Sequence, residues 1–173
     1  IDPNDVAVKI TPRTKAIMPI SIYGLSCDLD PLMNLGKKHK IPIINDAAEA
    51  FGTDNSGTTY KGKSIARIAD ITSYSLENSK HITCGDGGIV VTNDSEIATR
   101  MRKFGSLGYR VIEATDGRVR NFKDFFQRPD YKRHDTFGFN YRLPEVAAAM
   151  GLAQTERLEF FLDLRASIAA MYL

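Results

Sequence analysis

Apolar and polar positions along the chain follow two different periods, one typical of strands and one typical of helices. Four short runs of apolar and β-branched residues have the length and composition of buried strands, and they span 15–20, 41–44, 68–75 and 88–92. Around them, apolar residues recur every three or four positions, and this spacing predicts helices over 3–10, 28–40, 94–104 and 144–173.

The order of these elements predicts an α/β fold. The strands at 15–20 and 41–44 are joined through a helix, which requires a crossover connection and parallel pairing. We therefore expect a mostly parallel sheet that is flanked by helices.

The composition narrows the class of protein. The chain has 173 residues, of which 43% are hydrophobic, and its 23 Lys and Arg residues nearly balance 21 Asp and Glu residues. Such a mixture is typical of a soluble globular domain or a piece of one. A net charge of +2 without long basic blocks argues against nucleic acid as a partner. The longest apolar stretches fall far short of the roughly 20 residues that cross a bilayer, so no membrane span is expected.

The cysteines and the two chain ends add further expectations. Cys27 and Cys84 match neither a disulfide framework nor a metal-ligand spacing, which favours a reducing cytoplasm and no metal site. The sequence opens at Ile1 without a signal peptide and closes at Leu173 inside a helical pattern. We therefore expect a fragment that lacks both ends of the protein.

Three polar residues follow predicted strands, where ligands bind in doubly wound sheets. Asp46 follows the strand at 41–44, Ser75 closes the strand at 68–75 ahead of Lys80, and Asp28 follows the segment at 15–20 through a short turn. By position alone, Asp46 is as compatible with a helix N-cap as with a ligand contact, and Lys80 with a solvated surface residue. In a desolvated pocket, however, a lysine becomes an amine nucleophile that forms a Schiff base with an aldehyde.

Several segments in register carry a more specific signal, and they span 45–52, 73–75, 79–88, 91–94 and 138–142. Their residues, order and spacing resemble the pyridoxal-phosphate-dependent sugar aminotransferases of the DegT/DnrJ/EryC1/StrS family, including its perosamine synthase-like members. The resemblance implies that residues 1–143 are the central part of the large domain of a fold type I transferase. It also implies that residues 144–173 form a long helix leading toward a C-terminal small domain.

The resemblance assigns roles toward pyridoxal 5'-phosphate to five residues. Lys80 is similar to the lysine that forms the Schiff base with the cofactor and moves the substrate proton. Asp46 is similar to the acid that keeps the pyridine nitrogen protonated. Glu49 occupies the place beside the phenolic oxygen, Ser75 that of a phosphate-binding serine, and Asn140 that of an asparagine reaching the phosphate in a neighbouring subunit. The last role implies a homodimer with shared active sites.

Two further residues are candidates for substrate contacts, each with a plain structural alternative. His81 adjoins Lys80 and either lines the substrate side or serves packing alone. Arg142 either neutralises phosphate or carboxylate charge or is solvated. Ser21 stands where family members usually have His, which leaves the substrate contacts of that segment open.

The resemblance implies an aminotransferase that moves an amino group from an amino acid, with L-glutamate as the expected donor, onto a nucleotide-linked keto sugar. Two alternatives remain open at this point, namely a sugar dehydratase with the same cofactor and a catalytically silent, cofactor-binding fragment. Dehydratases of the family carry His in place of the Schiff-base lysine. Because Lys80 occupies that place and His81 follows it, the sequence favours transamination.

Overall fold

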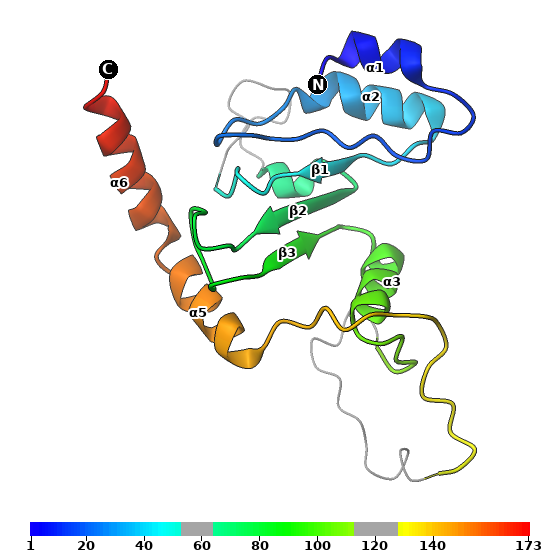
Figure 1. Ribbon diagram of the computed structural model, residues 1–173. Coiled ribbons are helices and arrows are strands. Elements are labelled where there is room, and N and C mark those ends of the chain that lie inside the picture. Colours follow the sequence, from blue (N-terminus) through cyan, green and yellow to red (C-terminus); the bar gives the residue numbers. More distant parts are fainter. Residues whose placement is uncertain (53–63, 113–127) are drawn as a thin grey trace. The chain divides into compact units, whose positions relative to one another are not determined.

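The structure is a computed structural model that describes residues 1–52, 64–112 and 128–173 (Figure 1). The chain divides into two compact units. One consists of residues 1–92 together with 144–173, and the other of residues 93–143. Each unit is described by itself below. None of the helices in the described ranges has the length and apolar character that crossing a bilayer requires.

Two helices open the first unit, and both match the sequence pattern. Helix α1 spans Pro3–Lys9, and its N-cap Asp2 accepts a hydrogen bond from the Asn4 backbone N–H at 2.8 Å. Helix α2 spans Leu29–His39 and ends where Lys40 adopts a left-handed conformation, with φ 56°. The two predicted helices are thus confirmed.

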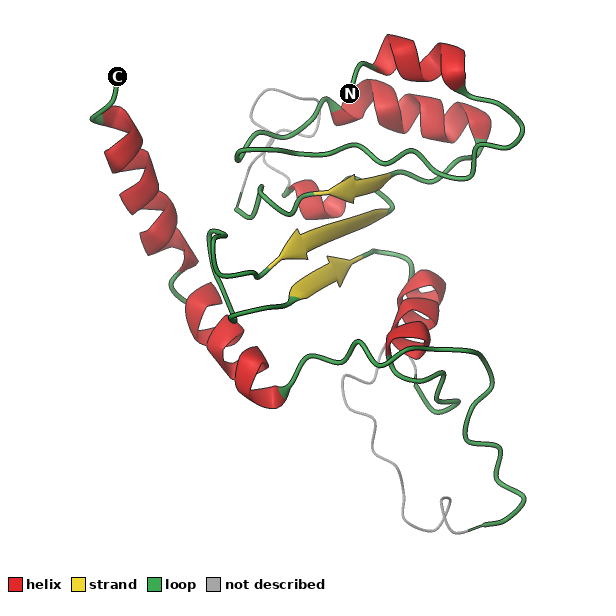
Figure 2. Ribbon diagram, in the orientation of Figure 1, coloured by secondary structure: helices red, strands yellow, loops and turns green. Residues whose placement is uncertain are grey.

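Three strands form a mixed sheet in the order β1–β2–β3 (Figure 2). Strand β1 spans Ile44–Asp46, β2 spans Ile71–Ser75 and β3 spans Gly88–Val91. Strand β1 pairs with β2 in parallel, whereas β2 and β3 are antiparallel because a loop without a helix joins them. The α/β class is confirmed, and the sheet carries one antiparallel pair beside its parallel part.

Two prolines explain why the observed strands differ from the predicted ones in the first part of the chain. The segment at 15–20 lies parallel to the β1 chain but makes only isolated bridges, Ile17 to Ile43 and Ile20 to Asp46. Pro19 has no N–H to donate, so the ladder loses the hydrogen bond between these bridges, and no regular strand forms there. The strand predicted at 41–44 begins only at Ile44, after Pro42, so the predicted bounds were wrong.

The strand predicted at 68–75 is also shorter in the structure. It begins at Ile71, because a 3₁₀ turn, η1 (Ile65–Arg67), and the bend that follows it take up the preceding residues. The Ser64 hydroxyl oxygen accepts a hydrogen bond from the Ala66 N–H at 3.3 Å and caps this turn. The β-branched pattern alone therefore placed the start of the strand too early.

Two apolar clusters hold the first unit together. One lies between the sheet and α2 and consists of Ile17, Leu32, Ile41, Ile43 and Ala69. The other lies under the turn that follows β1 and consists of Ala47, Ala50, Ile65 and Tyr74, with the Phe51 ring packed on Tyr74 at 4.8 Å. Burial of these side chains fixes the sheet and the start of the turn after β1.

The helical pattern at 144–173 forms two helices, α5 (Glu145–Thr155) and α6 (Leu158–Ala170), instead of the single long helix expected. At the end of α5, the Thr155 hydroxyl donates a hydrogen bond to the Gly151 carbonyl at 2.7 Å. Such a bond from Thr to the carbonyl four residues earlier bends and weakens a helix. The apolar positions keep their helical spacing across this break, so the sequence pattern did not reveal the break.

The second unit contains helix α3 (Ser95–Gly105). Asp94 caps it as predicted, because its carboxylate accepts hydrogen bonds from the Glu96 and Ile97 N–H groups at 2.8 and 2.9 Å. Two later residues contact the C-terminal end of this helix. Asn140 forms an isolated antiparallel β-bridge with Ser106, and the Asp135 Oδ2 lies 2.7 Å from the Lys103 Nζ.

Candidate active site

The polar residues predicted at strand ends meet at one edge of the sheet. Asp46 is the last residue of β1, Ser75 is the last residue of β2, and the two strands run in parallel with Asp46 opposite Ser73. In Figure 1 the arrowheads of β1 and β2 point to the same end of the sheet. The turn that carries Glu49 and the loop that carries Lys80 both begin at this edge.

Lys80 and Glu49 are in direct contact there. The Lys80 Nζ lies 3.4 Å from the Glu49 Oε1. The side chains are 21% and 37% exposed, respectively, so the amine is partly shielded and still open to a ligand. This contact rules out the alternative in which Lys80 is an unpaired, fully solvated surface residue.

A tight turn at Tyr23 and Gly24 holds Glu49 from the other side. The Tyr23 N–H donates to the Glu49 Oε2 at 3.3 Å, and the Gly24 N–H donates to the Glu49 carbonyl at 2.8 Å. Tyr23 adopts a left-handed conformation with φ 55°, which is uncommon for a non-glycine residue and is found often at functional sites. The turn therefore orients the carboxylate before any ligand arrives.

Asp46 is held by its main chain and its side chain. Its N–H donates to the Pro19 carbonyl at 2.9 Å, and its carbonyl accepts from the Ser21 N–H at 2.8 Å. Its Oδ1 accepts from the Ala48 N–H at 3.0 Å, and the described residues that follow directly, 47–52, form turns and no helix. The helix N-cap alternative is therefore wrong, and Asp46 instead forms an Asx turn at the strand end.

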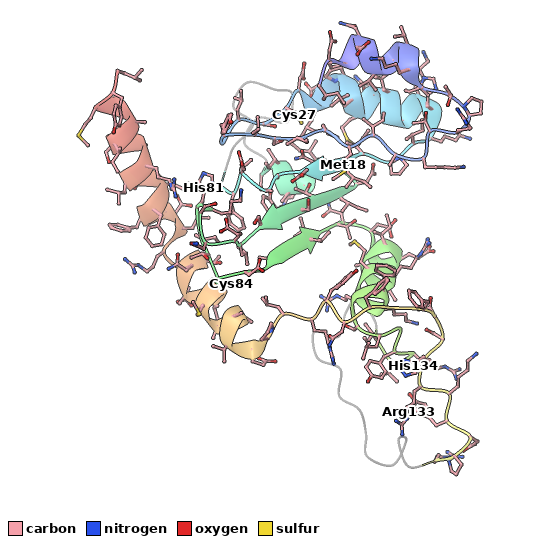
Figure 3. All side chains as sticks on the ribbon, in the orientation of Figure 1. Met18, Cys27, His81, Cys84, Arg133 and His134 are labelled. Atoms are coloured by element: carbon pink, nitrogen blue, oxygen red, sulfur yellow. The ribbon has the colours of Figure 1, made fainter. Side chains whose placement is uncertain are left out.

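Ser75 and His81 flank these groups. The Ser75 Oγ accepts a hydrogen bond from the Glu77 N–H at 3.2 Å, and its own proton remains available to a ligand as a donor. His81 directly follows Lys80 in the sequence, and Figure 3 labels it on the loop after β2. Burial, and after it the positive charge of Arg165, lower the pKa of the His81 imidazole, so the ring favours its neutral form.

Asn140 and Arg142 lie in the second unit and contact each other. The Arg142 Nε donates to the Asn140 Oδ1 at 2.8 Å, and Asn140 bridges Ser106. The structure thus gathers Asp46, Glu49, Ser75, Lys80 and His81 at one edge of the first unit. The roles given to these five residues, and those given to Asn140 and Arg142, stay predictions.

The sequence model of the DegT/DnrJ/EryC1/StrS aminotransferase family matches residues 1–173. The chain belongs to this family. Among its members, GDP-perosamine synthase of Caulobacter vibrioides is 36% identical over 172 residues, which are 99% of this chain and 40% of that protein. This chain therefore spans about 40% of the length of that relative.

Solved structures of the same fold agree with this placement. Helicobacter pylori PseC, described as an aminotransferase involved in the biosynthesis of pseudoaminic acid, matches with a TM-score of 0.76 and 31% identity, over 92% of this chain and 38% of PseC. The E. coli GDP-4-keto-6-deoxy-D-mannose-3-dehydratase has a TM-score of 0.76 at 24% identity, over 98% of this chain and 42% of the dehydratase, and shows a shared fold alone.

Two residues of the site were missed by the sequence analysis. One is Tyr23, whose N–H binds the Glu49 carboxylate, and the other is Arg165 of α6, whose guanidinium donates to the Lys80 carbonyl at 3.4 Å. The Tyr23-Gly24 dipeptide was a usable turn signal for the first. Arg165 is 85 positions away from Lys80 and lies on a helix with other charged residues, so no local signal marked it.

Proposed function

We propose that this chain is the central part of a pyridoxal-phosphate-dependent aminotransferase that moves an amino group from an amino acid, L-glutamate, onto a nucleotide-linked keto sugar. The observation that carries the proposal is the Lys80–Glu49 pair, which lies at the same sheet edge as the Asp46 carboxylate. A sugar-nucleotide substrate is supported by the similarity to GDP-perosamine synthase.

The side chains at this edge fit the chemistry of pyridoxal 5'-phosphate. A primary amine, Lys80, is the group that an aldehyde requires for covalent attachment. Asp46 supplies a fixed negative charge for a protonated ring nitrogen, and Ser75 supplies a hydroxyl donor for a phosphate. When bound, the cofactor supplies an electron sink that stabilises negative charge at the substrate carbon.

The remaining chemistry is proton movement, which the protein side chains perform. The Lys80 amine would accept the proton that leaves the substrate carbon and would later give it up again, acting first as a base and then as an acid. Glu49, held by the Tyr23 N–H, keeps this amine oriented. His81 lines the substrate side next to Lys80, and its neutral form avoids a further positive charge beside the amine.

Other parts of the proposal concern the whole protein. Asn140 reaches the phosphate group in a neighbouring subunit, which makes the enzyme a homodimer with shared sites, and Arg142 binds an anionic group of the substrate. The enzyme works in the cytoplasm, in keeping with two cysteines that are both unpaired. A dehydratase is less well supported because Lys80, and no histidine, pairs with Glu49.

The first experiment tests covalent attachment of the cofactor. The full-length protein is incubated with pyridoxal 5'-phosphate, reduced with borohydride and digested, and the modified peptide is identified by mass spectrometry. We expect the label on Lys80 and its loss in Lys80→Ala. Lys103→Ala is the matched control, because Lys103 is 19% exposed and pairs with Asp135 in the same way, and it should keep the label. Labelling that persists at the same level in Lys80→Ala contradicts the proposal.

The second measurement separates the reaction types. With ¹⁵N-labelled glutamate and a nucleotide-linked 4-keto-6-deoxy sugar, an aminotransferase transfers the isotope to the sugar. A dehydratase yields a sugar that has lost oxygen, and a silent binding protein leaves the sugar unchanged. Either of the last two products contradicts the aminotransferase assignment.

A further inference from the structure

Helix α6 contacts both segments that carry the Lys80–Glu49 pair. Leu162 packs on Gly52, three residues after Glu49, so closely that a Cβ on Gly52 would lie 2.6 Å from the Leu162 Cδ1. One turn further along α6, an Arg165 guanidinium nitrogen lies 3.4 Å from the Lys80 carbonyl oxygen. One helix therefore contacts the turn and the loop whose side chains meet in the site.

The Arg165 contact completes the hydrogen bonding of the Lys80 main chain. The Lys80 N–H donates to the Glu77 carbonyl at 3.1 Å within the loop, and the Lys80 carbonyl accepts from Arg165. With both groups bonded, the backbone orientation at Lys80 is tied to α6 as well as to its own loop. That orientation determines where the side chain starts and therefore which groups the Nζ can reach.

Helix α5 supports the same loop further along. The backbone of its Gly151 lies against Cys84 and Leu76, so that a Cβ there would be 3.5 and 3.6 Å from these side chains. Leu76 and Cys84 are themselves joined, because the Cys84 N–H donates to the Leu76 carbonyl at 3.0 Å. The two ends of the loop are thus packed on α5, and Arg165 is the polar contact from α6 at its middle.

The charge of Arg165 also acts on a residue of the site. The groups facing the His81 imidazole are Glu49 from the turn after β1, Lys80 from its own loop and Arg165 from α6. Arg165 and Lys80 lower the pKa of His81, and Glu49 raises it. The positive charge of Arg165 therefore acts on the His81 imidazole inside the site.

We propose that Arg165 is a positioning residue for the Lys80 amine, acting through the Lys80 carbonyl. The inference rests on the proposed role of Lys80 and adds a residue from outside the motifs that identify the family. Arg165 holds the peptide group of Lys80 so that the amine stays beside Glu49.

The first test uses the cofactor-free, full-length protein and reads the pKa of His81 by NMR titration. Arg165→Met should raise this pKa, because a neighbouring positive charge is removed. Arg165→Lys should leave it near the original value. Arg157→Met is the control, because Arg157 lies on the Phe160 and Phe161 rings at the start of the same helix. No change of the His81 pKa in Arg165→Met overturns the proposal.

The second test reads the function of Lys80 in the cofactor-loaded enzyme. We expect kcat/KM to fall about tenfold to a hundredfold in Arg165→Met. The visible absorbance of the lysine–cofactor adduct should also titrate at a different pH. Arg165→Lys should recover part of both, since it keeps the charge and has a single donor group instead of the fork. Arg165→Met values equal to those of Arg157→Met overturn the inference.

The two tests distinguish this inference from the proposed function. If the unmodified enzyme attaches no cofactor to Lys80, the proposed function fails. The His81 titration of the cofactor-free protein still shows whether Arg165 lies at the site.

Discussion

Glu49 and Lys80 form an ion pair with 3.4 Å between Oε1 and Nζ, although 31 residues separate them in the chain. Glu49 follows the first strand of the sheet and Lys80 follows the second, and parallel pairing brings the two strand ends together. The pair is partly exposed, so its effect on stability is expected to be small and its effect on the site large.

Glu49→Gln tests whether the pair affects the site more than it affects stability. The change removes the negative charge but keeps an oxygen for the Tyr23 N–H. We expect the pKa of His81 to fall in NMR titrations, because Glu49 raises it in the unmodified protein. Stability in urea should fall by no more than about 1 kcal/mol, as for other partly exposed pairs.

The matched control for that variant is Asp135→Asn, which breaks the Lys103–Asp135 pair in the second unit. It should leave the pKa of His81 unchanged. A rise of the His81 pKa in Glu49→Gln contradicts the site described above.

The pH dependence of stability follows from the same histidine. Its pKa is lower in the folded chain than the value of about 6.5 expected when the chain unfolds, so the unfolded state binds the proton more tightly. The free energy of unfolding should therefore fall as the pH drops from about 6.5 through the lower folded pKa. Urea unfolding at pH 7.5 and pH 5 measures this, and His81→Gln should show a smaller loss. An equal loss in both proteins would argue against the depressed pKa.

Gly52→Ala tests the packing of α6 on the turn after Glu49. Gly52 has a φ of 78°, a left-handed conformation that costs other residues roughly 1–2 kcal/mol. The new methyl group also meets the Leu162 side chain at the 2.6 Å noted above. We expect a loss of at least about 1 kcal/mol in urea unfolding, accompanied by weaker labelling of Lys80.

A double-mutant cycle separates the backbone cost at Gly52 from the clash with Leu162. In Leu162→Ala, the clash is absent and only the backbone cost remains, so Gly52→Ala should be less damaging there than in the unmodified protein. Equal costs in both backgrounds would show that α6 does not press on this turn.

Several features could be predicted from the sequence because they depend on short-range chemistry. Asp94 caps α3 as its position suggested, and the left-handed Lys40 ends α2 within the predicted basic cluster. The motif around Lys80 indicated the family because residues in one loop keep their spacing whatever surrounds them. The strand bounds were less accurate because Pro19 and Pro42 change which backbone groups are able to pair.

The sequence by itself determined which residues are candidates for the chemistry, namely an amine at Lys80 and acids at Asp46 and Glu49, since these are properties of side chains and their local order. Only the tertiary structure decided that Tyr23 holds Glu49 and that Arg165 holds Lys80. Those contacts join segments whose separation along the chain has no periodic signature. They exist because sheet pairing and helix packing bring distant backbone groups within hydrogen-bonding distance.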